Sequence, residues 1–68
     1  MNVGRGRVKI WFKGKGYGFI RSQETGDEIF FHRAEIESDQ KVIEGQKVEF
    51  EVKRTSKGLK AINVKLLS

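Results

Sequence analysis

The most distinctive side chains in this sequence lie in residues 13–21, KGKGYGFIR, where two large aromatics alternate with glycines and cations flank them. Glycine weakens a strand, because it has no side chain to pack and loses much backbone freedom on folding. Tyr17 and Phe19 are therefore either buried in a core or displayed on a surface. A second aromatic run, IFFH, follows at residues 29–32. Exposed rings beside lysine and arginine could stack unpaired bases and neutralise phosphates.

Other chemistry finds little support in the residue types. His32 is the only histidine and cysteine is absent, so a metal site would need carboxylates alone. No nucleophile motif surrounds any serine. Residues 14–18 resemble a phosphate-binding loop, but Phe19 stands where the dinucleotide fingerprint requires glycine, and no Gly-Lys-Ser/Thr follows. We therefore expect no catalytic residues, no metal site, no cofactor and no enzymatic activity.

The charge is unevenly distributed along the chain. The formal net charge is +5, and all nine acidic residues lie between Glu24 and Glu51, so the segments before and after carry cations only. If the two ends of the chain meet in space, they form a basic surface backed by an acidic one. Such a surface attracts nucleic acid, although charge alone is equally typical of a solvated, solubilising surface.

The length and hydropathy pattern limit the class of protein. We expect the 68 residues to form one domain, 1–68, since a chain this short cannot hold two. The longest apolar runs have three residues, which is too short for a transmembrane helix or a signal-peptide core. The absence of cysteine fits a reducing compartment. The sequence thus predicts a soluble, cytoplasmic monomer that does not bind membranes.

Alternation of apolar and charged residues with a period of two predicts the secondary structure. We expect strands at residues 7–12, 16–21, 28–32, 47–53 and 59–66. Turn signals lie at 24–27, 44–45 and 55–58, and residues 33–43 are expected to form a loop with one helical turn near 34–36. Five short strands that share one apolar set predict an all-β fold, a small closed barrel.

The alternation also separates core from surface. The predicted core is Val8, Ile10, Ile20, Ile29, Phe31, Ile36, Val48, Phe50, Val52, Ile62 and Val64. Tyr17 and Phe19 fall opposite Ile20, and pairing of strands 16–21 and 28–32 would add Phe30 and His32 to the same outer face. An aromatic on a strand is more often a core residue, but here the core is already full. We therefore expect these four rings to be displayed, with Gly16 and Gly18 keeping the inner face clear.

Two motifs carry a resemblance to a known family. Residues 15–20, KGYGFI, resemble the first ribonucleoprotein motif, and residues 29–32, IFFH, resemble the second. In the RNA-recognition motif the first of these lies late, on a third strand, after the other motif. Here it comes first, and together with 6–9 (GRVK), 44–50 (EGQKVEF) and 60–64 (KAINV) this order resembles the cold-shock domain of bacterial cold shock proteins from about Gly6 to Val64.

The resemblance implies a fold, a partner and a role. It implies a five-stranded antiparallel OB-type barrel that binds single-stranded RNA or DNA, as an RNA chaperone or a regulator of transcription or translation, often in cold adaptation. By position, it assigns stacking to Tyr17, Phe19, Phe30 and His32 and basic contacts to Lys9, Lys15, Lys57 and Lys60. Lys57 stands where the family usually has arginine, and Lys60 where it often has glutamine.

The chain departs from the family pattern at four places. The family reads K-W-F where residues 9–12 read KIWF; alternation directs Ile10 inward and Trp11 outward, so we expect Trp11 to stack. Arg33 replaces an aromatic, and its planar guanidinium could still stack on a base. The loop at 37–43 lacks the aromatic of many relatives, so one stacking site is expected to be missing, and Leu59 replaces a proline in the last turn.

A second class of function stays open. An OB barrel could instead bind the ribosome or a protein partner through its basic face. The four rings discriminate between the two functions, because a purely electrostatic contact does not require aromatic side chains.

Overall fold

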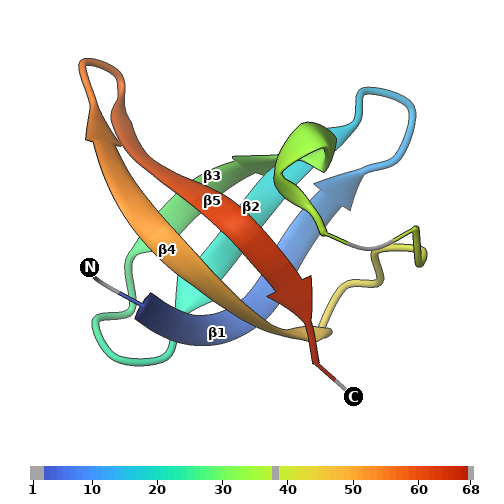
Figure 1. Cartoon of the computed structure of the whole chain (residues 1–68), viewed down its shortest axis with the longest axis horizontal. Helices are drawn as coiled ribbons and strands as arrows, with labels where there is room; N and C mark the ends of the chain where they lie inside the picture. The colour runs from blue at the N-terminus through green and yellow to red at the C-terminus, as the bar shows by residue number, and fades with distance from the viewer. Residues whose placement is uncertain (1–2, 38, 68) are drawn as a thin grey trace.

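The five predicted strands are present in the computed structural model, which describes residues 3–37 and 39–67. The elements are β1 (Val3–Phe12), β2 (Tyr17–Ser22), β3 (Glu28–His32), the 3-10 turn η1 (Arg33–Glu35), β4 (Lys47–Thr55) and β5 (Gly58–Leu66). The strands close into a barrel in the order β1-β2-β3-β5-β4 (Figure 1). Four strand pairings are antiparallel, and a short parallel contact between Phe30 on β3 and Lys60 on β5 closes the barrel. The predicted closed barrel is confirmed.

Strand β1 is longer than predicted because it pairs with two neighbours. Its first half, from Val3, pairs with β4, and its second half pairs with β2. Gly6 lies at a close approach of β1 and β2: a Cβ added there would lie 2.1 Å from the carbonyl oxygen of Arg21. Only glycine fits at this point. Because glycine is unfavourable in a strand, the sequence pattern did not predict that β1 begins at Val3.

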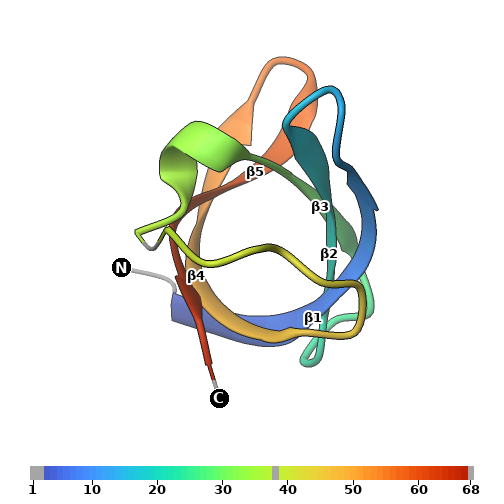
Figure 2. The same cartoon turned by 90° about the vertical axis from the view of Figure 1, so that its right-hand side faces the viewer.

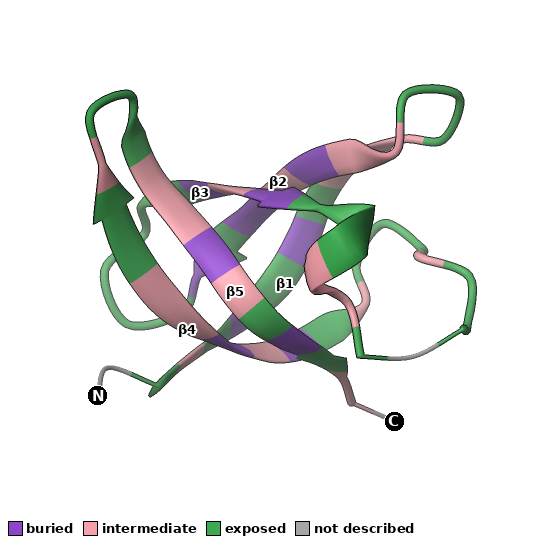
Figure 3. Ribbon diagram, turned by 45° about the horizontal axis from the view of Figure 1, so that its top comes forward, coloured by how far each residue is buried: buried purple, intermediate pink, exposed green. Residues whose placement is uncertain are grey.

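The apolar face of each strand builds one core inside the barrel. The fully buried hydrophobic residues are Val8, Ile20, Ile29, Phe31, Val48, Phe50, Ala61 and Val64. Figure 3 shows buried positions on all five strands, separated by exposed or half-buried ones. Ile36 and Val52, both predicted for the core, are half-buried and pack against it. The predicted inward set is therefore confirmed on β2, β3 and β4.

Strand β5 departs from simple alternation. Glu49 pairs with Lys65 while Glu51 pairs with Ile62, so β5 has one extra residue opposite Phe50. Asn63 within this bulge has a φ of 49°, a left-handed conformation that asparagine tolerates. Because of the bulge, Ala61 and Val64 both face inward and Ile62 is only half-buried. The prediction of Ile62 as a core residue was wrong.

A second bulge lies in β1. Val8 pairs with Ile20 and Ile10 pairs with Phe19, so Lys9 is the extra residue. Ile10 consequently lies beside Phe19, whereas Trp11 packs against the core and stacks on Phe31 with ring centroids 5.2 Å apart and an interplanar angle of 29°. The predicted facing, with Ile10 inward and Trp11 outward, was wrong.

Gly16 and Gly18, which were both predicted to keep the inner face clear, have different roles. A Cβ added to Gly18 would lie 2.2 Å from the Ile10 carbonyl oxygen and 2.9 Å from Cε3 of Trp11, so the Trp11 ring needs this position empty. Gly16 has a φ of 74° and no atom within 4 Å of an added Cβ. Gly18 therefore clears space, as expected, whereas Gly16 is needed for the left-handed backbone of the turn.

The connection from η1 to β4 crosses one end of the barrel (Figure 2). The Glu37 amide donates to the Val64 carbonyl at 2.9 Å, which fixes the start of the connection to β5. At its other end the Gly45 amide donates to Val8 at 2.7 Å, and Val8 donates to Gln46 at 2.9 Å. Val42 packs against the core between these anchors. The connection therefore lies next to the end of β1 that carries Trp11.

Candidate nucleic-acid interface

Four predicted rings lie together on β2 and β3. Tyr17 pairs directly with His32, and Phe19 pairs with Phe30. The centroid of the Phe30 ring lies 5.6 Å from that of Tyr17 and 6.0 Å from that of Phe19, the latter edge-on at 73°. The three rings Tyr17, Phe19 and Phe30 are half-buried and His32 is exposed, whereas their strand neighbours Ile20, Ile29 and Phe31 are buried. These four residues form one surface, the aromatic platform.

Phe12 extends the aromatic platform and was not predicted from the sequence. It pairs with Tyr17 at the end of β1, and the two ring centroids lie 5.2 Å apart at 49°. Strict alternation with Ile10 inward and Trp11 outward directs Phe12 inward, so the sequence pattern did not place it on the outer face. Its position directly across the β1–β2 turn from Tyr17 was the available signal.

The orientation of His32 is fixed by the turn that follows it. Its Nδ1 accepts a hydrogen bond from the Ala34 amide at 3.0 Å, and the side chain thereby caps η1. The other ring nitrogen, Nε2, is left available to a ligand on the exposed side of the ring.

Lys9 is already paired in the free protein. Its Nζ forms an ion pair with Glu28, and Nη2 of Arg21 lies 3.3 Å from the same carboxylate oxygen. The hydrogen bond from Lys9 lowers the pKa of Glu28 most, and the charges of Lys9 and Arg21 lower it further. All three side chains are exposed, so any anion that binds Lys9 has to compete with Glu28.

Lys60 borders the aromatic platform on its other side. It lies opposite Phe30 in the parallel contact between β3 and β5, and its Nζ is 3.9 Å from a carboxylate oxygen of Glu35. Lys9 and Lys60 thus lie on the two strands that flank the platform hairpin.

Trp11 retains an accessible side despite its contact with the core. A cavity of about 410 Å³ is lined by Trp11, Lys13, Arg33, Lys41 and Val42. The Arg33 amide donates to the Gly16 carbonyl at 2.9 Å, which ties the end of β3 to the β1–β2 turn. The structure therefore brings two predicted site residues, Trp11 and Arg33, into one cation-rich cavity. Lys41 and Val42 were missed, because their segment shows no periodic pattern.

Lys15 and Lys57 lie on two hairpin tips. Because β1 and β4 are antiparallel, the β1–β2 and β4–β5 turns lie at opposite ends of the barrel, far apart in Figure 1. Both side chains are exposed, and within the described part of the chain no side-chain hydrogen bond or ion pair joins either of them to the aromatic platform. The structure therefore does not bring Lys15 and Lys57 together.

Residues 4–67 match the model of the 'Cold-shock' DNA-binding domain. The chain belongs to the cold-shock domain family. It is 43% identical over 65 residues to the cold shock-like protein of Aquifex aeolicus, covering 93% of each chain. It is 46% identical over 63 residues to the cold shock protein CspC of Bacillus subtilis, covering 88% of this chain and 92% of that one. The resemblance inferred from the motifs is confirmed.

A solved structure supports the same assignment. The cold-shock domain aligns with "drosophila Unr CSD456" at a TM-score of 0.83 and 28% identity, over 98% of this chain and 27% of that chain. The predicted OB-type architecture is thereby confirmed. The family is one of nucleic-acid-binding domains rather than enzymes, so nucleic acid is the partner class, in preference to the ribosome- or protein-binding alternative.

Two further observations concern only the described residues. No helix among residues 3–37 and 39–67 is long and apolar enough to cross a bilayer. The same residues contain no group of three or more histidine, cysteine or acidic side chains that could hold a metal ion.

Proposed function

We propose that this cold-shock domain binds single-stranded RNA or DNA by stacking bases on the aromatic platform. The observation that carries the proposal is that Tyr17 and Phe19 both contact the Phe30 ring on the outer face of a barrel whose core is already filled. An unpaired base stacked on such a ring gains about 1–3 kcal/mol with little regard to its identity.

The binding residues divide into rings and cations. Tyr17, Phe19, Phe30 and His32 stack bases, and Phe12 supports the ring of Tyr17. Trp11 and Arg33 hold a further base in their shared cavity, beside Lys41. Lys9, Lys15, Lys57 and Lys60 neutralise phosphates around these rings. Since stacking needs unpaired bases, the site recognises single strands. We assign no catalytic role to any of these residues.

The cellular role follows from this kind of binding. A small domain that holds unpaired strands without strong sequence preference keeps RNA from pairing with itself, and so acts as an RNA chaperone or as a regulator of transcription or translation. We place residues 1–68 as one domain, monomeric and cytoplasmic. The relatives' description as cold shock proteins supports a role in the response to cold.

Titration of the tryptophan fluorescence tests the proposal. Trp11 is the only tryptophan, so a base in its cavity should quench the emission. Oligothymidylate or oligouridylate at low salt is expected to bind, and a duplex of the same length should bind at least about tenfold more weakly, because its bases are hidden in the stack. Equal affinity for both would reduce the contact to phosphates alone. Absence of binding by fluorescence and calorimetry would favour the protein- or ribosome-binding alternative.

A further inference from the structure

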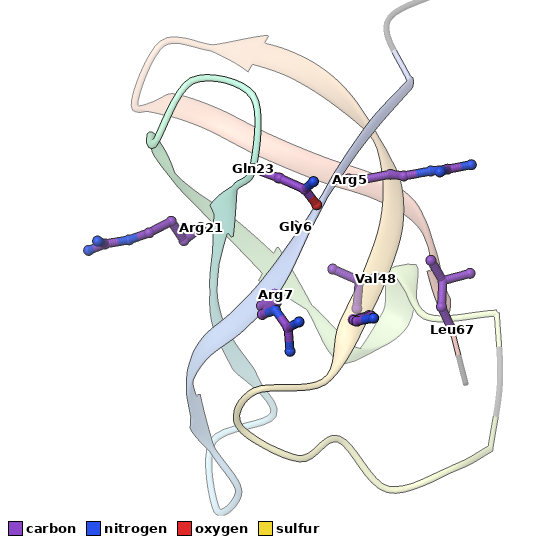
Figure 4. Close-up of a pocket in the computed structure, with 8 residues that line it drawn as sticks. Arg5, Gly6, Arg7, Arg21, Gln23, Val48 and Leu67 are labelled. Carbon is purple, nitrogen blue, oxygen red and sulfur yellow. The ribbon is translucent and has the colours of Figure 1, made fainter.

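A second cation-rich surface lies outside the aromatic platform. A cavity of about 540 Å³ is bordered by Arg5, Arg7, Arg21, Gln23, Lys47 and Leu67 (Figure 4). Its lining contains four cations and no carboxylate. It also contains no aromatic ring, so its chemistry suits an anion and offers nothing on which a base could stack.

Three of these cations stand side by side across three strands. Lys47 on β4 pairs directly with Arg7 on β1, and Arg7 pairs directly with Arg21 on β2. Like charges directly opposite one another destabilise a sheet. Lys47, Arg7 and Arg21 are here called the cationic row.

The fold provides little charge compensation for this row. Arg21 shares Glu28 with Lys9, and Arg7 donates only to the neutral Gly45 carbonyl, at 3.2 Å. Within residues 3–37 and 39–67, neither Arg7 nor Lys47 forms an ion pair. Figure 4 shows Arg5 and Arg21 directed to opposite sides, with Arg7 between them. An external anion would therefore meet unneutralised charge at the middle of the row.

The cationic row continues directly from the aromatic platform. Arg21 follows Phe19 by two positions on β2, and successive side chains on a strand alternate between faces, so both lie on the outer face. Their separation along the strand is about 7 Å. A strand stacked on Phe19 and extended toward the end of β2 thus passes over Arg21 and Arg7.

We propose that the cationic row binds backbone phosphates of the same single strand that stacks on the aromatic platform. The cationic row lengthens the binding site by a segment that contacts phosphates and does not stack bases. The inference rests on the proposed function, because it assigns the row to the continuation of that strand.

Two lengths of oligothymidylate test the proposal, one of about six nucleotides and one of about twelve, within the range of site sizes known for OB folds. The variants are Arg7→Gln and Lys47→Gln. The matched control is Lys65→Gln, which removes the same charge from an exposed position of β5 outside the cavity. Urea melts establish that each variant is folded, and all should be, since Arg7→Gln and Lys47→Gln relieve repulsion within the row.

Both row variants are expected to bind the short strand as the unsubstituted protein does. They should bind the long strand about three- to tenfold more weakly at low salt, with a slope of log affinity against log salt that is shallower by about 0.7 for each lost phosphate contact. The Lys65→Gln control should retain the full advantage of the long strand.

The outcomes separate the inference from the function on which it rests. If the unsubstituted protein binds neither strand, the proposed function fails and the inference fails with it. If it binds both, and the row variants match Lys65→Gln on the long strand, the row holds no phosphate and the inference alone is overturned.

Discussion

Phe30 and Phe31 are consecutive residues with the same side chain and opposite environments. Phe31 is fully buried and packs against Trp11, whereas Phe30 is half-buried and contacts Tyr17 and Phe19 on the outer face. The difference follows from the pleat of β3, which directs successive side chains to opposite faces. One of the two rings therefore belongs to the fold and the other is available to a ligand.

Alanine substitutions at these two positions should have opposite effects. Phe31→Ala removes a fully buried ring, which typically costs about 3–5 kcal/mol and should unfold a domain of this size. Phe30→Ala loses only cross-strand ring contacts, about 1 kcal/mol of stability, while the affinity for single strands should fall by about 1–3 kcal/mol. Urea melts and oligonucleotide titrations on both variants measure the two effects. An unfolded Phe30→Ala beside a folded Phe31→Ala would mean that the facing of β3 is inverted.

The ion pair between Glu28 and Lys9 affects both the acid stability of the domain and its affinity for single strands. The pKa of Glu28 lies below the ordinary value of 4.5, chiefly because of the hydrogen bond from Lys9. The stabilisation from this pair is thus fully present above pH 4.5 and is lost as the pH falls through the lowered folded pKa. Glu28→Gln removes that acid-dependent loss and frees both Lys9 and Arg21 for a phosphate. Affinity for single strands should rise about two- to threefold, and the salt slope should steepen by about 0.7.

Glu37→Gln is the matched control for Glu28→Gln. It removes the same charge from an exposed residue whose amide, but not its side chain, takes part in a hydrogen bond to Val64. If both variants raise affinity equally, the effect is one of net charge and does not come from the release of Lys9 and Arg21.

At the scale of the elements, two bulges position the site. The extra residue at Lys9 turns Trp11 onto Phe31, and the Trp11 ring then lies over Gly18 on the neighbouring strand. The bulge at Asn63 brings Ala61 and Val64 inward together. Without the first bulge, Trp11 would lie on the outer face and the cavity that it shares with Arg33 would lack its ring.

Glycine-to-alanine substitutions test this arrangement of β1 and β2. Gly18→Ala places a Cβ 2.2 Å from the backbone of Ile10 and should destabilise the domain enough to unfold it. Gly14→Ala is the control, because its Cβ meets no atom within 4 Å and its φ is not in the left-handed region. The control should be neutral or should raise the free energy of unfolding by about 0.4–1 kcal/mol. Comparable stability of the two variants in urea melts would contradict the close packing of Trp11 over Gly18.

The bulges also explain what could and could not be predicted from the sequence. Alternation predicted the strands, the closed barrel, the core residues of β2, β3 and β4, and the platform hairpin. It failed at Ile10, Trp11 and Ile62, since one inserted residue exchanges the two faces of everything beyond it. Nothing in the residue types around Lys9 or Asn63 indicates such an insertion. Phe12 was missed because the bulge at Lys9 also exchanges its face, and Lys41 was missed because it joins the site only through packing between segments that are distant in sequence.

At the scale of the whole molecule, the two basic ends of the chain do not pair. Strand β1 pairs with β2 and β4, and β5 pairs with β3 and β4, so β1 and β5 are not neighbours in the barrel, although Leu67 borders the same cavity as Arg5 and Arg7. Acidic residues between Glu24 and Glu51 form ion pairs with cations from both basic ends of the chain, such as Glu49 with Arg5 and Glu35 with Lys60. The cations without a carboxylate partner in the described residues include Lys13, Arg33 and Lys41 around the Trp11 cavity.

This distribution of cations predicts that the affinity for single strands depends on the salt concentration. The cations around the rings should neutralise about two to four phosphates of a short strand, which gives a slope of log affinity against log salt of about −1.5 to −3. Lys15→Gln should make the slope shallower by about 0.7, because the exposed ammonium of Lys15 neutralises one phosphate and thereby releases counterions from the nucleic acid. Phe19→Ala should lower affinity at every salt concentration and leave the slope unchanged, because a ring neutralises no phosphate. Titrations of the three proteins across ionic strength measure both quantities. A slope that changes with the ring and not with the lysine would mean that the rings and cations do not contribute separately, and the division of the site into stacking and phosphate contacts would be wrong.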